Sequence, residues 1–195
     1  AQVESGILQE DPDQFKVVEI LENLSENVAK DGILESIKEL FKNPPNQLEG
    51  VYIYGGVGRG KTMLMDLFFD SIKTDKKIRQ HFHRFMQSIH TRLAELSGKT
   101  DPLSIVVSEL EKNYDLICFD EFYVEDIGDA MLLGRSLEKL LASKVKMVFT
   151  SNIKPNDLYV GGLQRKSFLS AISAIEKHCE IICLESNTDY RLREL

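Results

Sequence analysis

The glycine-rich run GGVGRGKT, from Gly55 to Thr62, constrains this chain more than any other stretch of its sequence. It separates the apolar run VYIY from the apolar run MLMDLFF, and its spacing fits G-x-x-x-x-G-K-[ST]. In such loops the backbone N–H groups surround an anion, and larger side chains would block its approach. A glycine turn with a solvated lysine is the alternative, but a strand before the run and a helix after it are typical of phosphate binding. We therefore predict a phosphate-binding loop.

The loop and the first turn of the following helix supply the predicted ligands of the phosphates. Lys61 is expected to reach the terminal phosphates, and the hydroxyl of Thr62 is expected to bind Mg²⁺. The helix directs the positive end of its dipole towards the nucleotide. The predicted nucleotide-binding residues of this segment are Gly55, Gly56, Val57, Gly58, Arg59, Gly60, Lys61 and Thr62.

Composition limits the class of protein. The 195 residues, 43% hydrophobic and 28% charged, are an ordinary length for one domain with one core. A net charge of −7 argues against general nucleic-acid binding, which needs a basic face. No apolar run approaches the ~18 residues of a membrane span, and the N-terminus has no signal-peptide pattern, so we expect a cytoplasmic protein. Cys118, Cys179 and Cys183 are expected to be buried apolar residues without disulfide or metal roles.

Apolar periodicity predicts five strands that alternate with helices. This order is typical of an α/β fold in which a parallel sheet has helices on both faces. The expected strands are 51–54, 79–84, 116–119, 145–150 and 180–184. The expected helices are 61–72, 86–97, 102–113, 127–142 and 164–178.

A helical segment is predicted before the first strand. Asp11, Pro12 and Gln14 form a capping-box pattern, after which apolar residues recur at helical spacing. A second helical run follows Gly32 and ends at the sequence NPPN. The expected organisation is a helical segment, 1–46, packed on an α/β core, 47–195.

Two acidic residues follow a strongly apolar strand. The run Leu116–Phe119 leads directly to Asp120 and Glu121, at the edge where a parallel sheet presents its ligands. Asp120 is suited to hold Mg²⁺ through water, and Glu121 is suited to orient and polarise a water that attacks the γ-phosphate. A strand that ends in two solvated acids is the alternative, which the presence of the glycine loop disfavours.

An asparagine follows the next predicted strand, VKMVFTS. Asn152 is able to hydrogen-bond the γ-phosphate or the attacking water, because an amide both donates and accepts. A turn role is the alternative, since asparagine favours turns. Its place at the carboxyl end of a strand favours a catalytic role.

These residues, together with several further runs, resemble a known family. The glycine loop, the strand that ends in Asp-Glu and the strand that ends in asparagine resemble the core of the AAA+ ATPases. More narrowly, GVGRGKT, HFHRFM, CFDEFYVEDIGDAMLLG, TSN, GLQR and TDYRLR are similar to the ZapE family of bacterial cell-division ATPases and its mitochondrial relatives. The resemblance extends over nearly the whole chain.

The resemblance implies ATP as the nucleotide, ATP hydrolysis, a ring-like homo-oligomer and action on a protein partner. For bacterial members it implies association with the FtsZ ring and recruitment to the division site. It also implies that the strand before Asn152 lies between the strands before Lys61 and Asp120. Arg165, in GLQR, matches an arginine that completes the neighbouring subunit's catalytic site. Family members continue into a helical lid after TDYRL, and we expect this chain, which stops at Leu195, to lack it.

The run HFHRFM has a pattern of its own. Polar and apolar residues alternate from His81, so we expect His81 and His83 on one face of a strand. Two histidines fall short of a metal site, which needs further ligands at recognisable spacing. In AAA+ proteins a polar residue that ends this strand often restrains the catalytic glutamate, and Arg84 or His83 is the candidate for that role on Glu121.

Other function classes share parts of the pattern. A GTPase switch requires N-K-x-D, whereas residues 152–157 are NIKPND. A small-molecule kinase shares the glycine loop but gains nothing from Glu121 and Asn152. A helicase-loader-type AAA+ module that engages nucleic acid has the same sheet and site. The kinase and the helicase loader therefore stay as alternatives, the loader being the closer.

Overall fold

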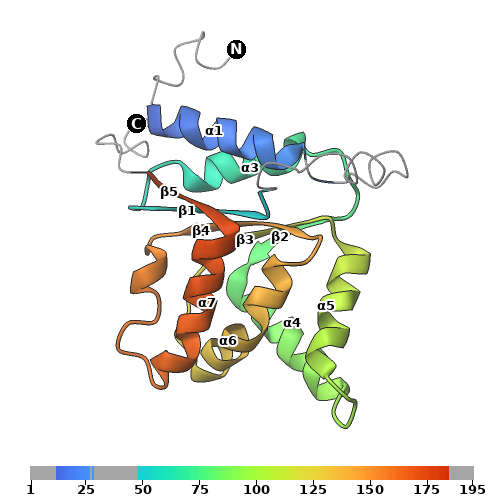
Figure 1. Ribbon diagram of the computed structural model, residues 1–195. Helices are drawn as coiled ribbons and strands as arrows, with labels where there is room; N and C mark the ends of the chain where they lie inside the picture. Colours follow the sequence, from blue (N-terminus) through green and yellow to red (C-terminus); the bar gives the residue numbers. More distant parts are fainter. Residues whose placement is uncertain (1–11, 27, 29–47, 185–195) are drawn as a thin grey trace.

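The computed structural model describes residues 12–26, 28 and 48–184, which form one sheet between two helical layers (Figure 1). The strands are β1 Gly50–Gly55, β2 Lys77–His81, β3 Leu116–Asp120, β4 Lys146–Ser151 and β5 Cys179–Leu184. They pair in parallel in the order β2-β3-β4-β1-β5. The predicted α/β class is confirmed, and β4 lies between β1 and β3 as the resemblance implied.

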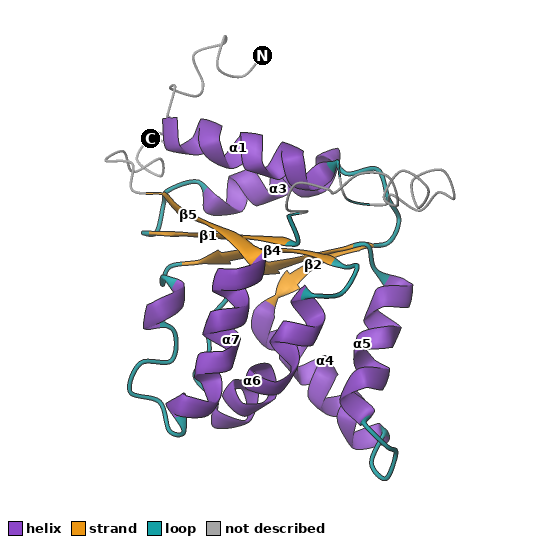
Figure 2. Cartoon of the chain, viewed as in Figure 1, coloured by secondary structure: helices purple, strands orange, loops and turns teal. Residues whose placement is uncertain are grey.

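Helices cover both faces of the sheet (Figure 2). On one face lie α1 Pro12–Ser25 and α3 Lys61–Ser71, and on the other lie α4 Phe82–Glu95, α5 Pro102–Asn113, α6 Ile127–Leu141 and α7 Arg165–His178. A short 3-10 helix, η1 Pro155–Asp157, follows β4. No helix within the described ranges has the length and apolar character that a membrane span requires.

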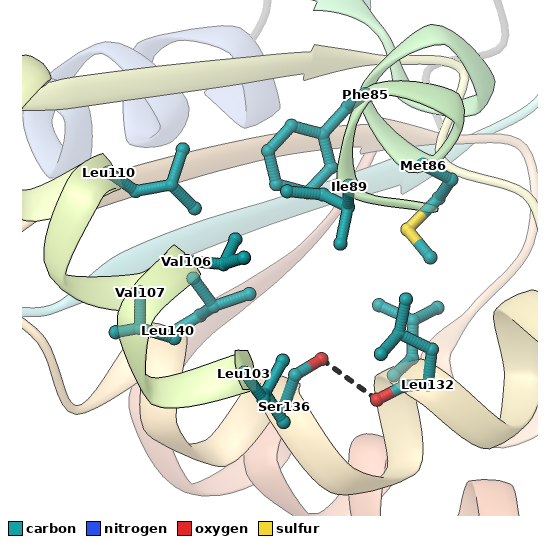
Figure 3. Close-up of a pocket in the computed structure, with 11 residues that line it drawn as sticks. Phe85, Met86, Ile89, Leu103, Val106, Val107, Leu110, Leu132, Ser136 and Leu140 are labelled. Carbon is teal, nitrogen blue, oxygen red and sulfur yellow. Dashed lines mark hydrogen bonds between the residues drawn. The ribbon is translucent and has the colours of Figure 1, made fainter. Parts of the chain in front are cut away.

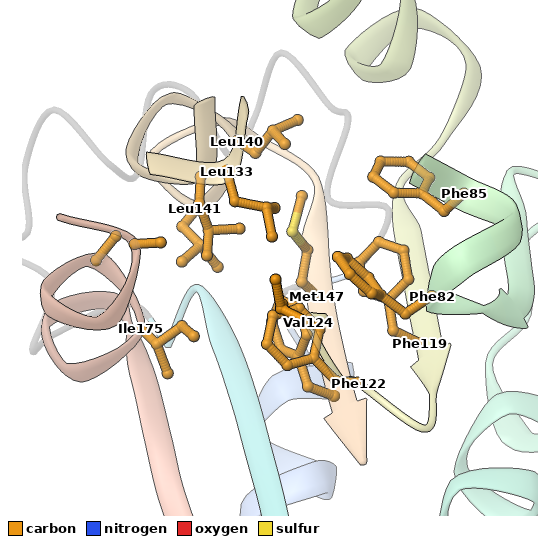
Figure 4. Packing of buried hydrophobic residues seen from close by; sticks show 14 of the residues in the cluster. Phe82, Phe85, Phe119, Phe122, Val124, Leu133, Leu140, Leu141, Met147 and Ile175 are labelled. Carbon is orange, nitrogen blue, oxygen red and sulfur yellow. The ribbon is translucent and has the colours of Figure 1, made fainter. Parts of the chain in front are cut away.

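The two faces of the sheet contribute to separate hydrophobic clusters, because neighbouring side chains along a strand point to opposite faces. Phe119 and Phe149 stack at 5.3 Å between ring centroids on the side of α4 to α7. Phe82 and Phe122 pack against this pair, and Figure 4 shows them beside Phe119. Leu116, Cys118 and Val148 belong to the other cluster, with α1 and α3. Strands buried on both faces hold the polar residues at their carboxyl ends in fixed positions.

The predicted N-terminal helix is present as α1. Val17, Leu21 and Leu24 are almost fully buried and belong to the same cluster as residues of α3 and β1. Helical spacing therefore places α1 on the core. The predicted cap Asp11, the second helical run, NPPN and the proposed 46/47 boundary lie outside the described residues.

The prediction of a strand over 79–84 is wrong at its carboxyl end. Strand β2 ends at His81, and α4 begins at Phe82, four residues before the predicted start. The reason is that Phe82, Phe85, Met86 and Ile89 are spaced for a helix and all are buried. His81 and His83 consequently do not share a strand face. Strand β2 also begins, and α4 also ends, two residues earlier than predicted, and the bounds of the other predicted elements differ by at most one residue.

Candidate nucleotide-binding site

The glycine loop connects the carboxyl end of β1 to the first turn of α3. Gly60, directly before α3, has φ of 84°, in the left-handed region that glycine adopts without strain. Gly55 is needed for space, because a Cβ there would lie 2.3 Å from the carbonyl oxygen of Leu184 on β5. Backbone conformation at Gly60 and space at Gly55 therefore require glycine, in addition to the room that the motif leaves for an anion.

Lys61 is buried at the centre of the loop. Its Nζ donates to the carbonyl oxygens of Gly55 at 2.8 Å and Gly56 at 2.7 Å, and to Oδ1 of Asn152 at 2.9 Å. Burial, with a smaller contribution from the charge of Arg59, lowers the pKa of Lys61. All three acceptors are neutral, so the positive charge of Lys61 is available to an anion. The loop therefore fits a phosphate group.

Asn152 lies directly after β4, and other contacts hold this turn. The hydroxyl of Tyr52, on β1, donates to the carbonyl oxygen of Ile153 at 2.8 Å. Ser151 Oγ donates to the carbonyl oxygen of Phe122 at 2.8 Å. The carboxyl ends of β1, β3 and β4 are thus joined around the contact between Lys61 and Asn152.

Helix α1 reaches the loop through Gln14. This side chain is buried, and its Nε2 donates to the carbonyl oxygen of Arg59 at 3.4 Å. A Cβ at Gly60 would lie 3.0 Å from the same nitrogen. Sequence analysis assigned Gln14 only to a helix cap, since its spacing carries no sign of a partner 45 positions away.

Asp120 ends β3 with its side chain 12% exposed. Its Oδ2 accepts from Nε of Arg79 on β2 at 2.7 Å, and its Oδ1 lies 3.5 Å from Oγ1 of Thr150. Arg79 also forms an ion pair with Asp66 of α3. Sequence analysis assigned no role to Arg79 or Asp66.

One face of β2 is basic, which explains how Arg79 reaches Asp120. Lys77, Arg79 and His81 share this face, because alternate residues of a strand point the same way. Nζ of Lys77 donates to the carbonyl oxygens of Phe69 and Ile72 at the end of α3. Correct strand bounds would have shown this alternation in the sequence.

Glu121 follows Asp120 in a left-handed conformation, with φ of 52°. Such a backbone is unusual for a residue other than glycine and is often found at functional sites. The side chain is 82% exposed, and its Oε2 lies 3.8 Å from Nδ1 of His81. The contact that the structure shows is therefore with His81, whereas sequence analysis named His83 or Arg84, which lie in the first turn of α4.

The oxygen atoms expected to hold Mg²⁺ come from two elements. Thr62 is exposed in the first turn of α3, and Asp120 ends β3. Hydroxyl and carboxylate oxygens are the donors that this hard cation prefers. The residues present therefore fit a magnesium ion.

Arg165 is the first residue of α7, on the face of the sheet opposite α3 (Figure 1). Its Nη2 donates to the carbonyl oxygen of Asn156 at 2.8 Å. Its Nε is buried without a hydrogen-bond partner among the described residues. The structure does not bring Arg165 into the contacts of Lys61 and Asn152.

A separate pocket lies between α4, α5 and α6 (Figure 3). Its lining is apolar except for Ser136, whose Oγ donates to the carbonyl oxygen of Leu132 at 2.8 Å. The lining residues are Phe85, Met86, Ile89, Leu103, Val106, Val107, Leu110, Leu132, Leu133, Ser136 and Leu140. None of these side chains is charged, so the pocket lacks the partners that a triphosphate requires.

Several known proteins are similar to this chain. The family model of the AFG1-like ATPases matches residues 1–195. The cell division protein ZapE of Escherichia coli strain K12 is 49% identical over 168 residues, which are 86% of this chain and 44% of that protein. The chain thus spans less than half the length of this curated relative.

Solved structures show the fold. The crystal structure of DnaI has a TM-score of 0.58 at 14% identity and covers 92% of this chain and 89% of that chain. AMPPCP-bound DnaA from Aquifex aeolicus has a TM-score of 0.53 at 20% identity and covers 82% of this chain and 47% of that chain. The likeness places the sheet and loop in the P-loop AAA+ fold.

Proposed function

The chain belongs to the AFG1-like ATPase family, and we propose on that basis that it binds ATP with Mg²⁺ at the glycine loop and hydrolyses the γ-phosphate. The observation that carries this proposal is the contact of Lys61 with Asn152, beside the strand that ends in Asp120 and is followed by Glu121. It supports a site in which phosphate-binding and water-positioning groups are close together.

Binding is assigned to the loop. Backbone N–H groups from Gly55 to Gly60 and the ammonium of Lys61 contact the phosphates, and Gln14 supports the loop from α1. Thr62 and Asp120 would hold Mg²⁺. When bound, this ion neutralises negative charge on the phosphate oxygens.

Catalysis is assigned to the ends of β3 and β4. Glu121 orients and polarises the attacking water, which requires position more than an unusual pKa. Asn152 offers its Nδ2 to the γ-phosphate or the water, because its Oδ1 accepts from Lys61. His81 lies close enough to restrain Glu121 while no partner is bound.

A second copy is proposed to complete the site. In a ring, Arg165 of one subunit contacts the γ-phosphate held by its neighbour and stabilises the charge of the transition state. The place of Arg165 in GLQR, where the resemblance implies an arginine that serves the neighbouring subunit, supports this role.

The protein is proposed to use ATP hydrolysis to act on a protein partner. The similarity to ZapE, which is named a cell division protein, supports a partner at the division ring formed by FtsZ. The test is capture of partners by a full-length protein with Glu121→Gln, which retains ATP. Capture of FtsZ only with ATP supports the partner, and equal capture by wild-type and Lys61→Ala proteins contradicts it.

Phosphate release tests the reaction itself. The protein is incubated with Mg²⁺ and either ATP, GTP or ATP with candidate small-molecule acceptors, and free phosphate is measured. We expect free phosphate from ATP without any acceptor, and not from GTP. Phosphate transfer to an acceptor without free phosphate would identify a kinase, and salt-dependent binding to single-stranded DNA would favour a helicase-loader role.

A further inference from the structure

Arg79 joins two acidic residues that come from different elements. Its Nε donates to Asp120 at 2.7 Å, and Nη1 forms an ion pair with Asp66 on α3. Exposure of the side chains falls along the series, from 44% for Asp66 to 27% for Arg79 and 12% for Asp120. The guanidinium is always charged, so the three side chains carry a net charge of about −1.

A stabilising role explains this arrangement poorly. Ion pairs with partners as exposed as Asp66 contribute little to stability. The neighbouring Lys77 already connects β2 to α3 through the carbonyl oxygens of Phe69 and Ile72. Arg79 instead places a fixed positive charge against the carboxylate assigned to the divalent cation.

We propose that Arg79 is a positioning residue that holds Asp120 by one oxygen and, balanced by Asp66, sets how strongly the site binds the divalent cation of its nucleotide. This inference rests on the proposed function. Oδ2 of Asp120 is occupied by Nε of Arg79, which leaves Oδ1, beside Thr150, for a water of the cation. The negative charge of Asp66 partly offsets the repulsion between Arg79 and the cation.

The net charge of the three side chains predicts opposite effects on cation binding for substitutions of Asp66 and of Arg79. Asp66→Asn raises the net charge of the three side chains from −1 to 0, which weakens binding of the cation. Arg79→Met lowers it to −2, which strengthens binding of the cation and weakens binding of free ATP. The double variant returns to −1. A purely structural ion pair predicts no such reversal.

The experiment measures affinity and does not depend on turnover. A fluorescent, non-hydrolysable ATP analogue is titrated into the whole protein in excess Mg²⁺ and in excess EDTA. The Kd in EDTA is divided by the Kd in Mg²⁺, so a larger ratio means a stronger dependence on the cation. Relative to wild type, we expect the ratio to fall at least about threefold in Asp66→Asn and to rise by a similar factor in Arg79→Met. We expect the double variant to lie within about twofold of wild type.

Arg92→Met is the matched control. Arg92 binds Glu109 at 2.6 Å and Glu95 at 2.8 Å, on α5 and α4, so its loss also breaks an arginine pair. It should leave the ratio unchanged, and thermal unfolding confirms that each variant is folded. Shifts of the same sign in both single variants, or no shift, overturn the inference. If Arg79→Met does not fold, the ratio measured for Asp66→Asn decides the inference. A wild-type protein without Mg²⁺-dependent binding overturns the proposed function as well.

Discussion

Lys61 and Asn152 are joined by a direct hydrogen bond of 2.9 Å although they lie 91 positions apart in the sequence. Lysine has only donors, so the amide must present its oxygen to Lys61. Its NH₂ group is then available to a phosphate oxygen or to a water. One contact thus fixes the orientation of the amide as well as the position of the ammonium.

Two substitutions should separate binding from hydrolysis. We expect Lys61→Ala to weaken ATP binding, because Lys61 is proposed to contact the phosphates in the ground state. Glu121→Gln should bind ATP nearly normally and lose hydrolysis, because Glu121 is proposed to act when water is activated. Equilibrium binding and phosphate release measure the two effects. Equal losses of affinity in both variants would contradict the assignment.

The donor side of Asn152 is tested by Asn152→Asp. The carboxylate keeps an acceptor for Lys61 but removes both donors and adds a negative charge beside the phosphates. Loss of a donor that stabilises a transition state lowers kcat by about 10²–10³-fold. We expect that decrease, together with weaker ATP binding and undiminished thermal stability. Hydrolysis at the wild-type rate would show that Asn152 acts only as a turn residue.

Gln14 links α1 to the loop and should affect affinity more than stability. Gln14→Ala removes the contact with Arg59 and should weaken ATP binding by more than about tenfold, which is about 1.4 kcal/mol, with only about 0.5–1 kcal/mol lost in unfolding free energy. Leu21→Ala, in the buried face of the same helix, should cost about 2–5 kcal/mol. Titration with ATP measures the affinity of each variant, and urea unfolding measures its unfolding free energy. A larger effect of Gln14→Ala on unfolding than on affinity would indicate simple packing.

His178 should make stability depend on pH. Burial disfavours its charged form, but the carboxylates of Glu49 and Glu138 outweigh burial and raise the pKa of His178. A raised pKa in the folded state adds stability that is fully present below the unfolded value of about 6.5 and is lost as pH rises through the folded value.

Urea unfolding of wild type and His178→Gln should therefore show the largest difference below about pH 6.5 and a smaller one at higher pH. Glu138→Gln removes one of the two carboxylates, whose Oε1 lies 3.1 Å from Nε2 of His178, and should weaken this dependence. A difference that grows with rising pH would contradict the direction of the shift.

Most of the fold could be predicted because local signals agree with one another. Strand β1, the glycine loop and α3 each have a pattern that is independent of distant residues, as do the apolar strands before Asp120 and Asn152. The wrong boundary at His81 arose because alternation over a few residues fits a strand and the first turn of an amphipathic helix equally well.

The parts of the site that sequence analysis missed depend on pairing between elements. Arg79 meets Asp120 because β2 and β3 are neighbours in register, and it meets Asp66 because α3 crosses the same face. Spacing along the chain does not carry that information. The left-handed backbone at Glu121 is equally invisible, since the sequence there continues with Phe122 and no glycine marks the turn.

Arg165 should act on the site of a neighbouring subunit. A cation at a helix N-terminus is disfavoured by roughly 0.3–1 kcal/mol, so folding alone gives little reason for Arg165 to begin α7. Its guanidinium donates to the backbone of Asn156, and Nε remains without a partner among the described residues. Contact with a γ-phosphate in a neighbouring subunit, the role that the resemblance implies, would give a reason for this position. Arginine fingers in related phosphate chemistry contribute about 10³–10⁵ in rate.

Subunit mixing distinguishes this role from one within the same chain. Arg165→Ala keeps a sound nucleotide pocket, and Lys61→Ala keeps a sound arginine, so mixed rings contain some complete sites. We expect hydrolysis of the mixture to exceed that of either variant alone, measured as phosphate release from full-length protein. Size-exclusion chromatography of differently tagged variants establishes that they assemble together. If they do and the mixture gains nothing, Arg165 serves only its own subunit or the protein surface.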